Sequence, residues 1–427
     1  MLPFSASDLT IYGSGSLTVN GNYNDGIASK DGLVIASGSE NITSVDDGNY
    51  KRAVTSISVD VTAKDDGIRG KDYLIVKDGA KITVKAGGDG LKSDNAEDAT
   101  RGYIWIESGE LNITSGKDAI AAETDALISD GTISLTSGGG SNYSVPTGTS
   151  AKGIKGLVLA IIAGGNIDIN SADDAIHSNN TVIIDNGAFA IATKDAAIHA
   201  DVSATINEGS LNISKCYEGI ESAAITVNNG TINMLASDDG FNATKGRRTE
   251  ANDGSSFTIN GGYIAINSSR GDGLDSNGNA IITGGTVIVH GPQSQPEVGF
   301  DINGTFNISG GLFIATGPNS GHMIEVPSST STQYSVKVTF FSTLSASTLF
   351  HIQDASGNDI VTFKPVRNIY YLVFSSPNLI KGSTYSIYTG GSSSGTNTNG
   401  LYIGGTYSGG TLRKSFTISN KVTNVSI

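Results

Sequence analysis

The sequence has one cysteine, Cys216, and only 8 prolines among its 427 residues. A single cysteine excludes a disulfide framework, so packing, backbone pairing or bound metal must stabilise the chain. No apolar run approaches the ~20 residues of a membrane-spanning helix, and no stretch keeps the heptad pattern of a coiled coil. The opening MLPFSASDLT has neither a basic start nor an apolar core, so we predict no signal peptide in it.

Positive charge is also scarce. Lysine and arginine number 27 against 41 aspartates and glutamates, which leaves a formal net charge of -14. Such a surface repels phosphate backbones and anionic lipids alike. We therefore expect neither nucleic-acid binding nor membrane insertion, and we expect a monomer.

Glycine is plentiful, at 56 residues, and short apolar segments recur with a fixed period. One apolar residue follows each acidic turn. From Ile154 to Phe241, these apolar residues lie 22, 22, 22 and 21 positions apart. A fixed period of this length is the signature of a repeat architecture. The buried apolar positions of the series are Ile27, Ile68, Leu91, Ile120, Ile154, Ile176, Ile198, Ile220, Phe241 and Leu274, with Phe300 as a weaker last copy. We interpret the longer step from Ile27 to Ile68 as a skipped weak coil.

The pattern within each repeat predicts strands. Segments such as 165–169, 187–191 and 209–213 alternate apolar and other residues with period two, which is typical of a strand with one buried face. Three short strands fill a repeat, and equivalent strands must run parallel because one whole coil separates them. We predict an all-β protein, a parallel β-helix of about 22 residues per coil, right-handed by the crossover rule.

The repeats begin near Leu9 and fade after Thr316. Residues 326–427 lack the acidic turn and show longer strands, at 334–341 and 368–376. We therefore predict two parts: a β-helix over residues 1–325, and a C-terminal β-rich module or cap over residues 326–427. A cap is expected because open sheet ends need covering.

The acidic turn predicts a calcium site. Coils stack about 4.8 Å apart, so equivalent carboxylates form ladders and repel one another unless a cation joins them. Calcium takes six to eight oxygen ligands in flexible geometry. The alternative is that Asp and Asn only suit tight turns and cap backbone amides; Asp89 and Asp118, each without a second carboxylate, fit that alternative better. The candidate metal ligands are Asp173, Asp174, Asp195, Glu218, Glu221, Asp238, Asp239, Asn242, Asp272 and Asp275.

Long insertions flank the same strand stack and predict a groove along it. They span residues 92–103, 137–151 and 243–256, and function concentrates on such loops. One place after each buried apolar residue the chain carries a cationic streak, whose alternative is a solvated polar ladder. Trp105 follows a loop and either stacks on a sugar or covers the side of the helix. The candidate substrate-binding residues are Arg69, Lys92, Trp105, Lys155, His177 and His199.

The succession KGIKG, DDAIHSN, DAAIHAD, YEGIES and DDGFNATK resembles the carbohydrate-binding β-helix proteins of polysaccharide-degrading anaerobic bacteria, which are themselves similar to a calcium-dependent pectate-lyase family. The resemblance covers about residues 9–316, and the stretch 372–391 also looks like that family's ending. It implies a secreted or cell-surface protein with bound calcium that holds cellulosic or acidic, pectic plant polysaccharide.

The related lyases hold calcium in an Asp-Asp-Gly-x-Asp turn and use a lysine one coil further as the base. Asp238, Asp239 and Asn242 match that turn, but the next coil offers Asp275 where the base belongs. The resemblance therefore assigns no catalytic residue, and Lys92 and Lys155 are weak candidates. We expect a calcium-dependent polysaccharide-binding protein. The alternatives are a pectate lyase acting by calcium-assisted β-elimination and a structural surface adhesin.

Overall fold

The computed structural model describes residues 4–38, 41–46, 49–53, 56–246 and 251–427. Strands are the main regular structure of the described residues, and turns connect them; their helical part is one 3₁₀ turn, η1 (Gly321–Met323). Within them no helix has the length and apolar character to cross a membrane. The predicted fold class, an all-β parallel β-helix, is confirmed by the long stacks of parallel strands.

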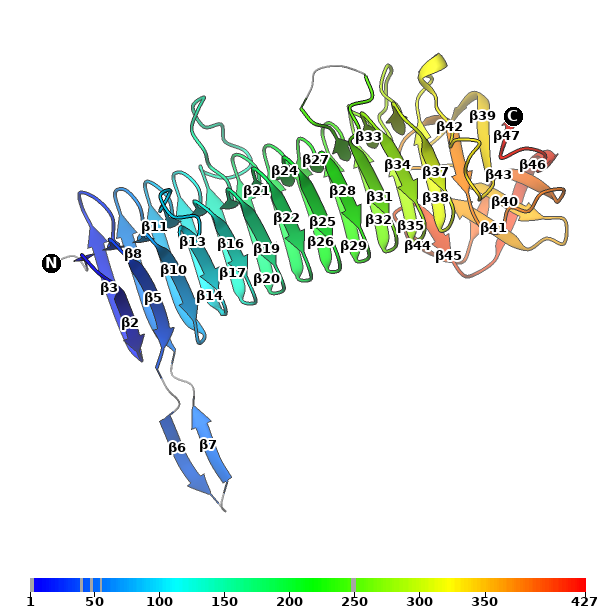
Figure 1. The fold of residues 1–427 in the computed structure, drawn as a ribbon. Coiled ribbons are helices and arrows are strands. Elements are labelled where there is room, and N and C mark those ends of the chain that lie inside the picture. Colours follow the sequence, from blue (N-terminus) through cyan, green and yellow to red (C-terminus); the bar gives the residue numbers. More distant parts are fainter. Residues whose placement is uncertain (1–3, 39–40, 47–48, 54–55, 247–250) are drawn as a thin grey trace. The chain divides into compact units, whose positions relative to one another are not determined.

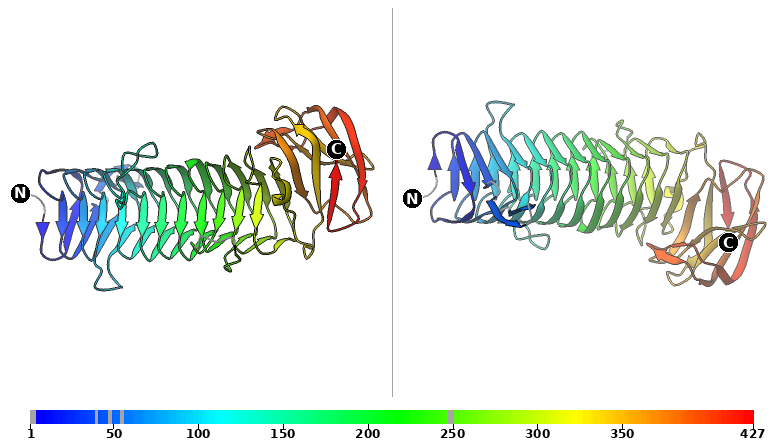
Figure 2. Two further views of the ribbon diagram at one scale, coloured as in Figure 1. Left: turned by 90° about the horizontal axis from the view of Figure 1, so that it is seen from above. Right: turned by 90° about the horizontal axis from the view of Figure 1, so that it is seen from below.

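The chain divides into two compact units, residues 1–217 and 218–427, which are described separately. Each coil of the first unit visits three strand positions, which we call A, B and C. Figure 1 and the two views of Figure 2 show equivalent strands of this unit side by side, coil after coil.

The A strands of the first unit are β1 (Phe4–Ser5), β4 (Ile27–Ser29), β9 (Ile68–Gly70), β12 (Leu91–Ser93), β15 (Ile120–Ala122), β18 (Ile154–Gly156), β21 (Ile176–Ser178) and β24 (Ile198–Ala200). The B strands are β2 (Leu9–Gly13), β5 (Gly32–Ser37), β10 (Tyr73–Lys77), β13 (Tyr103–Ile106), β16 (Asp125–Ile128), β19 (Leu159–Ile162), β22 (Thr181–Ile184) and β25 (Ser203–Ile206). The C strands are β3 (Gly15–Gly21), β8 (Ile57–Ala63), β11 (Ala80–Ala86), β14 (Gly109–Ser115), β17 (Thr132–Ser137), β20 (Asn166–Ser171), β23 (Ala188–Thr193) and β26 (Ser210–Cys216).

The apolar series forms the core of these coils. Ile154 pairs in register with Ile176, and Ile176 with Ile198, and all three side chains are buried. The residue before each of them must be small. A Cβ on Gly90 would lie 2.5 Å from the carbonyl oxygen of Ala119 in the next coil, so this coil requires glycine there. Other coils accommodate a buried alanine at the same position, as at Ala175 and Ala197.

The long step between the first copies is not a skipped coil, as the sequence had suggested. Ile27 pairs directly with Ile68, so the two belong to adjacent coils. The extra residues include an antiparallel hairpin, β6 (Asn41–Asp46) with β7 (Asn49–Ala53), inserted between β5 and β8. A hairpin pairs its own backbone groups, so it can be added without disturbing the stack.

The second unit begins with four more coils. Its A strands are β27 (Ile220–Ser222), β30 (Phe241–Ala243), β33 (Leu274–Ser276) and β36 (Phe300–Ile302). Its B strands are β28 (Ala224–Val227), β31 (Ser256–Ile259), β34 (Asn279–Ile282) and β37 (Phe306–Ile308), and its C strands are β29 (Thr231–Ala236), β32 (Tyr263–Ser268), β35 (Thr286–His290) and β38 (Leu312–Gly317).

Parallel stacking in this unit stops at β38, which pairs antiparallel with β42 (Ile369–Ser375). The strand β39 (Ser335–Leu344) pairs with β42 and with β47 (Val422–Ser426). A further sheet has the order β44 (Thr396–Thr398), β45 (Leu401–Ile403), β41 (Asp359–Phe363), β40 (Phe350–Asp354), β43 (Thr384–Ser393), β46 (Tyr407–Thr417). A separate apolar cluster lies among these strands. The boundary at 325/326 stays a prediction.

Candidate acidic-turn and outward-face site

The carboxylates of the acidic turns cap the backbone of the following coil. We call these positions, two places before each buried apolar residue, the turn ladder. The amide of Asp89 donates to Oδ1 of Asp66 at 2.8 Å, and the amide of Asp118 to Oδ1 of Asp89 at 3.1 Å. In the second unit the amide of Asp272 donates to Oδ1 of Asp239 at 2.6 Å. The turn ladder therefore has a structural role in both units, as the amide-capping alternative predicts.

In the first unit, the second carboxylate oxygen of several turn-ladder aspartates lies close to the ammonium group of a lysine. The ammonium of Lys92 lies 3.0 Å from Oδ2 of Asp66 and 2.7 Å from Oδ2 of Asp89. That of Lys155 lies 3.3 Å from Oδ2 of Asp118. Burial alone would lower the pKa of Lys92, but the hydrogen bonds and charges of the two aspartates raise it. The ammonium therefore stays charged.

Lys152 occupies the turn ladder itself, where other coils have an acid. Its ammonium lies 2.8 Å from Oδ1 of Asp173 and 2.7 Å from Oδ2 of Asp174. Burial would raise the pKa of Asp174, but the hydrogen bond from His177 and the charge of Lys152 together lower it to about 2. Asp173, Asp174 and Asp195 bring one carboxylate oxygen each within 4.8 Å of one another, and the Lys152 ammonium already contacts two of these residues. Their role as metal ligands stays a prediction.

The predicted cationic streak forms one row on the outer face of the A strands. We call these positions, one place after each buried apolar residue, the outward column. Register places Arg69 beside Lys92, Lys155 beside His177, and His177 beside His199. Arg69 also has an acidic partner, with Nη2 2.7 Å from Oδ2 of Asp94. Five of the six predicted substrate-binding residues thus share a face, although their role stays a prediction.

Trp105 lies elsewhere. It is on the B strand β13, and its indole N–H donates to Oγ of Ser129 at 3.0 Å. Its neighbour in the next coil is Leu127. Trp105 therefore covers the B face of the first unit and does not belong to the outward column.

Two of the predicted loops flank the A strands in the first unit. The loop after β12 is held to the preceding coil, where Asn95 Nδ2 donates to Oδ1 of Asp72 at 2.6 Å. The loop after β17 reaches over later coils, and Lys215 donates to Oδ1 of Asn142 at 2.9 Å. Because one loop leaves the A strands and the other enters them, they border this face on both sides. Of the third predicted loop, residues 247–250 lie outside the described residues.

The second unit repeats the turn ladder but changes the outward column. The turn ladder here is Glu218, Asp239 and Asp272. In the outward column, register places Glu221 beside Asn242, Asn242 beside Asp275, and Asp275 beside Asp301. Where the first unit carries lysine, arginine and histidine, this unit therefore carries acids and one amide.

These acids are strongly perturbed. Burial, together with Glu221, raises the pKa of Glu218 to about 8. Burial, with the charges of Asp272 and Asp238, raises the pKa of Asp239 to about 8. Burial, with Asp275 and other acids nearby, raises the pKa of Asp272 to about 8. Each carboxylate is thus costly to ionise at neutral pH unless a cation compensates it.

No such cation is supplied by the described part of the chain. Among the described residues, no lysine or arginine forms an ion pair with Glu218, Asp238, Asp239 or Asp272. Two buried oxygens, Oε2 of Glu218 and Oδ1 of Asn242, have no hydrogen-bond donor among the residues that the structure describes. Carboxylate and amide oxygens are the ligands calcium prefers, so the residues of this cluster fit the ion chemically. The calcium itself stays a prediction.

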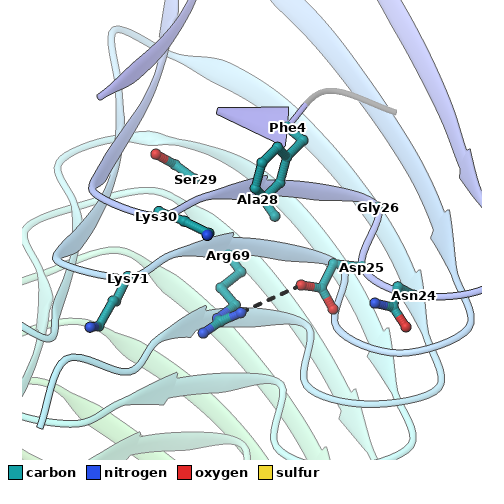
Figure 3. A pocket seen from close by; sticks show the side chains of 9 residues that line it. All are labelled: Phe4, Asn24, Asp25, Gly26, Ala28, Ser29, Lys30, Arg69 and Lys71. Atoms are coloured by element: carbon teal, nitrogen blue, oxygen red, sulfur yellow. Dashed lines mark ion pairs between the residues drawn. The ribbon is translucent and has the colours of Figure 1, made fainter. Parts of the chain in front are cut away.

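A cavity of about 580 Å³ opens on the outward column at the first three A strands (Figure 3). Phe4 pairs in register with Ala28, and Ala28 with Arg69, so Phe4 is the first member of the column. Its ring is 63% exposed, and the ammonium of Lys30 lies 5.9 Å from the ring centroid. The cavity is lined by Phe4, Asn24, Asp25, Gly26, Ala28, Ser29, Lys30, Arg69 and Lys71. It joins an aromatic face to three cations and one carboxylate.

A second hollow, of about 590 Å³, lies on the outer face of the C strands from β14 to β26. Its exposed residues are small and polar, such as Asn112, Ser134 and Asn212. It carries no cation and no exposed ring among its lining residues. This face therefore offers a ligand fewer charged and aromatic groups than the cavity of Figure 3 does.

Several residues of these sites were missed from the sequence. Phe4 and Lys30 precede or flank the first clear repeat, so nothing marked them as part of the column. Asp301 follows the weak copy at Phe300 in the same position as the other outward residues, and that register was the available signal. Glu325 has no repeat signal; burial raises its pKa to about 7, and its Oε2 accepts from the amide of Ile302 at 3.0 Å.

The comparisons with known proteins point to one family. A family model described as "Carbohydrate-binding domain-containing protein" matches residues 3–52 and 51–197. This match and the parallel-strand architecture fit a carbohydrate-binding β-helix. Neither a curated protein nor a solved structure matches the chain. The pectate-lyase similarity has no support from these comparisons.

Proposed function

We propose that this protein binds an acidic polysaccharide of the plant cell-wall type along the outward face of its A strands, and that binding depends on calcium. The polymer is of the polygalacturonate class, and the protein acts outside the cell or on its surface. The binding needs no bond-breaking chemistry. The proposal has one part for the sugar and one for the ion.

The support for a sugar comes from the matched family and the cavity of Figure 3. The family model covers the coils that build the cavity. An exposed ring such as Phe4 offers an apolar face for a sugar ring. Beside it, Lys30, Arg69 and Lys71 present positive charge in a protein of net charge -14. That combination suits a sugar residue bearing a carboxylate.

The support for calcium is the contrast between the two units, and this observation carries the proposal. In the first unit the outer oxygens of Asp66, Asp89 and Asp174 meet a lysine within 3.0 Å. In the second unit Asp239 and Asp272 keep the same turn and amide cap, but no ion pair among the described residues reaches them. A bound divalent ion would supply the missing charge and leave coordination sites for the polymer.

A lyase would also need a neutral base, and the observations do not favour one. Lys92 is the lysine that follows an acidic turn by one coil, but its two aspartates keep its ammonium charged. Lys155 is likewise held by Asp118 at 3.3 Å. A protonated amine cannot remove a proton from the sugar. Binding is therefore the function that the geometry supports best.

The test is retention on immobilised polygalacturonate, with calcium and after chelation. We expect retention with calcium and its loss with chelator, and weaker retention for Lys30→Gln with Lys71→Gln. Lys81→Gln is the matched control, because that lysine pairs with Glu110 on the exposed C face. Equal retention with calcium and after chelation would refute the calcium dependence. Failure to bind polygalacturonate, its methyl ester or cellulose would refute polysaccharide binding and favour a structural adhesin.

A further inference from the structure

Two histidines lie side by side in the outward column of the first unit. His177 on β21 pairs in register with His199 on β24, and their rings are stacked with centroids 5.0 Å apart and an interplanar angle of 17°. Two nitrogens bound on opposite sides of one zinc-sized ion lie about 4 Å apart, given metal–nitrogen bonds of about 2 Å. A ring nitrogen of each histidine and a carboxylate oxygen of Asp174 lie within 4.8 Å of one another. Because stacked rings aim their lone pairs in parallel directions, both rings must rotate before they share one ion.

The ring of His177 is already oriented by a buried carboxylate. Its Nδ1 lies 2.8 Å from Oδ2 of Asp174, a residue that is almost fully buried and also contacts the Lys152 ammonium at 2.7 Å. With Nδ1 donating to Asp174, the nitrogen left for a metal ion is Nε2, which would first lose any proton that it donates to Asn179. A carboxylate behind a histidine in this way is the usual support for a metal-binding imidazole.

Oxygen ligands stand next to both Nε2 atoms. The Nε2 of His177 lies 2.8 Å from Oδ1 of Asn179, and the Nε2 of His199 lies 3.0 Å from Oδ1 of Asp201. Both oxygens come from exposed residues two places along the chain. The motif His-x-Asn in one coil and His-x-Asp in the next thus places one oxygen beside each histidine. Among the described residues, the acid whose oxygen lies within 4.8 Å of a nitrogen of both histidines is Asp174.

We propose that His177 and His199 bind a divalent transition-metal ion of the zinc type, with Asp174 supporting His177 and the exposed Asn179 and Asp201 each beside one of the histidines. Imidazole nitrogen favours zinc, copper or nickel, whereas calcium favours an all-oxygen set. The site is therefore distinct in chemistry from the acidic cluster around Asp239. It faces solvent, so water or an anionic group completes the coordination sphere.

The experiment measures zinc binding by calorimetry on the full chain, without a polyhistidine tag and with calcium in excess. Excess calcium saturates oxygen-only sites and leaves the imidazole site to zinc. We expect the parent to bind one equivalent of zinc, and His177→Gln or His199→Gln to bind it about tenfold more weakly or worse. Cobalt added in place of zinc should give a visible absorption band that both substitutions remove.

His322→Gln is the matched control, because that histidine is exposed on η1 in the second unit. It should bind zinc as the parent does. If a histidine variant fails to fold, Asp201→Asn replaces it, since that side chain is 56% exposed and its loss should weaken binding severalfold. Zinc binding that is absent in the parent, or unchanged in the His177→Gln, His199→Gln double variant, would overturn the proposal.

Discussion

The two oxygens of a turn-ladder carboxylate have separate roles. Oδ1 accepts the amide of the next coil, as between Asp66 and Asp89 or between Asp239 and Asp272. Oδ2 faces the position where charge must be compensated. At Asp89 that compensation is the ammonium of Lys92, and at Asp239 no residue among those described supplies it. The same residue type in the same turn is therefore structural in one coil and a candidate ligand in another.

Asp239→Asn should weaken calcium binding while preserving the fold. The amide oxygen of asparagine can still accept from the backbone of Asp272, now at 2.6 Å from Oδ1, but the negative charge is lost, and calcium affinity depends on ligand charge. We expect the calcium dissociation constant, measured by titration, to rise about tenfold, which is about 1.4 kcal/mol.

Asp89→Asn is the internal control for that measurement. Its carboxylate pairs with Lys92 at 2.7 Å, so the substitution should lower stability slightly and leave calcium affinity unchanged. Equal and negligible effects of both substitutions on calcium affinity would support the view that these turns only cap backbone amides.

Lys152→Gln should destabilise the first unit and leave two carboxylates without a cation, a charge that bound metal can compensate. The lysine side chain is 12% exposed and touches both Asp173 and Asp174; breaking such a pair leaves buried charge uncompensated and costs about 3 kcal/mol. Urea unfolding measures the loss. Added calcium should recover part of it, because Asp173, Asp174 and Asp195 hold three oxygens within 4.8 Å of one another.

Two results would contradict this account of Lys152. One is a loss no larger than that of Lys81→Gln, an exposed pair for which about 0.5 kcal/mol is expected. The other is a loss that calcium does not reduce at all, which would show that the position vacated by the ammonium is not a cation site.

At the scale of elements, the strand β35 shows how the last coils join the antiparallel sheets within the second unit. His290 at its end is buried, stacks on Phe363 with centroids 5.4 Å apart, and has its Nε2 3.0 Å from the carbonyl oxygen of Asn399. Burial lowers the pKa of His290 to about 4, against the weaker raising effect of Asn399 and with the help of Arg367. Burial therefore favours the neutral ring in the folded protein.

We expect this contact to weaken as pH falls from 6.5 to 4. In that window the unfolded chain binds a proton on His290 and the folded chain does not, so protonation favours unfolding. The contribution is complete above pH 6.5 and is lost as pH falls toward 4, by roughly 3 kcal/mol in all. Thermal unfolding of the parent and of His290→Gln, across this range, measures it.

The variant should lose the part of the pH dependence that belongs to His290, and His322→Gln should keep it. Parallel pH profiles for the parent and His290→Gln would show that the ring titrates freely and that the contact does not depend on its neutral form.

At the scale of the whole molecule, the net charge of -14 causes repulsion that cations bound to the folded chain reduce. General screening and a specific site can be told apart, because screening needs salt at high concentration and does not distinguish among divalent ions. The raised pKa values of Glu218, Asp239 and Asp272, each about 8, indicate where specific binding would relieve most repulsion.

Calcium should therefore raise the unfolding temperature of the parent. An ion that binds only the folded state adds about 2.7 kcal/mol at a hundred times its dissociation constant. Magnesium at equal concentration should do less, since it demands stricter octahedral geometry and retains its water. Calorimetric scans with calcium, magnesium or chelator make the comparison. A transition that calcium and chelator leave in the same place would contradict the calcium proposal.

The sequence by itself determined the fold and which residues share the turn ladder or the outward column. A period near 22 residues with an apolar residue in constant phase implies stacked coils, and stacking places residues of equal phase beside one another. That is why Arg69, Lys92, Lys155, His177 and His199 could be assigned to one face without coordinates. The weak copy at Phe300 carried the same information for Asp301.

Only the tertiary structure decided what each side chain in a row contacts. Periodicity gives the row, but a contact depends on the length and direction of a side chain across coils. Lys152 reaches the acids of the following coil, Trp105 turns to the B face, and Phe4 joins the column through backbone pairing that its sequence does not signal. The 41-residue interval between Ile27 and Ile68 contains an inserted hairpin. Because the hairpin pairs its own strands, the residues before and after it keep their register in the stack.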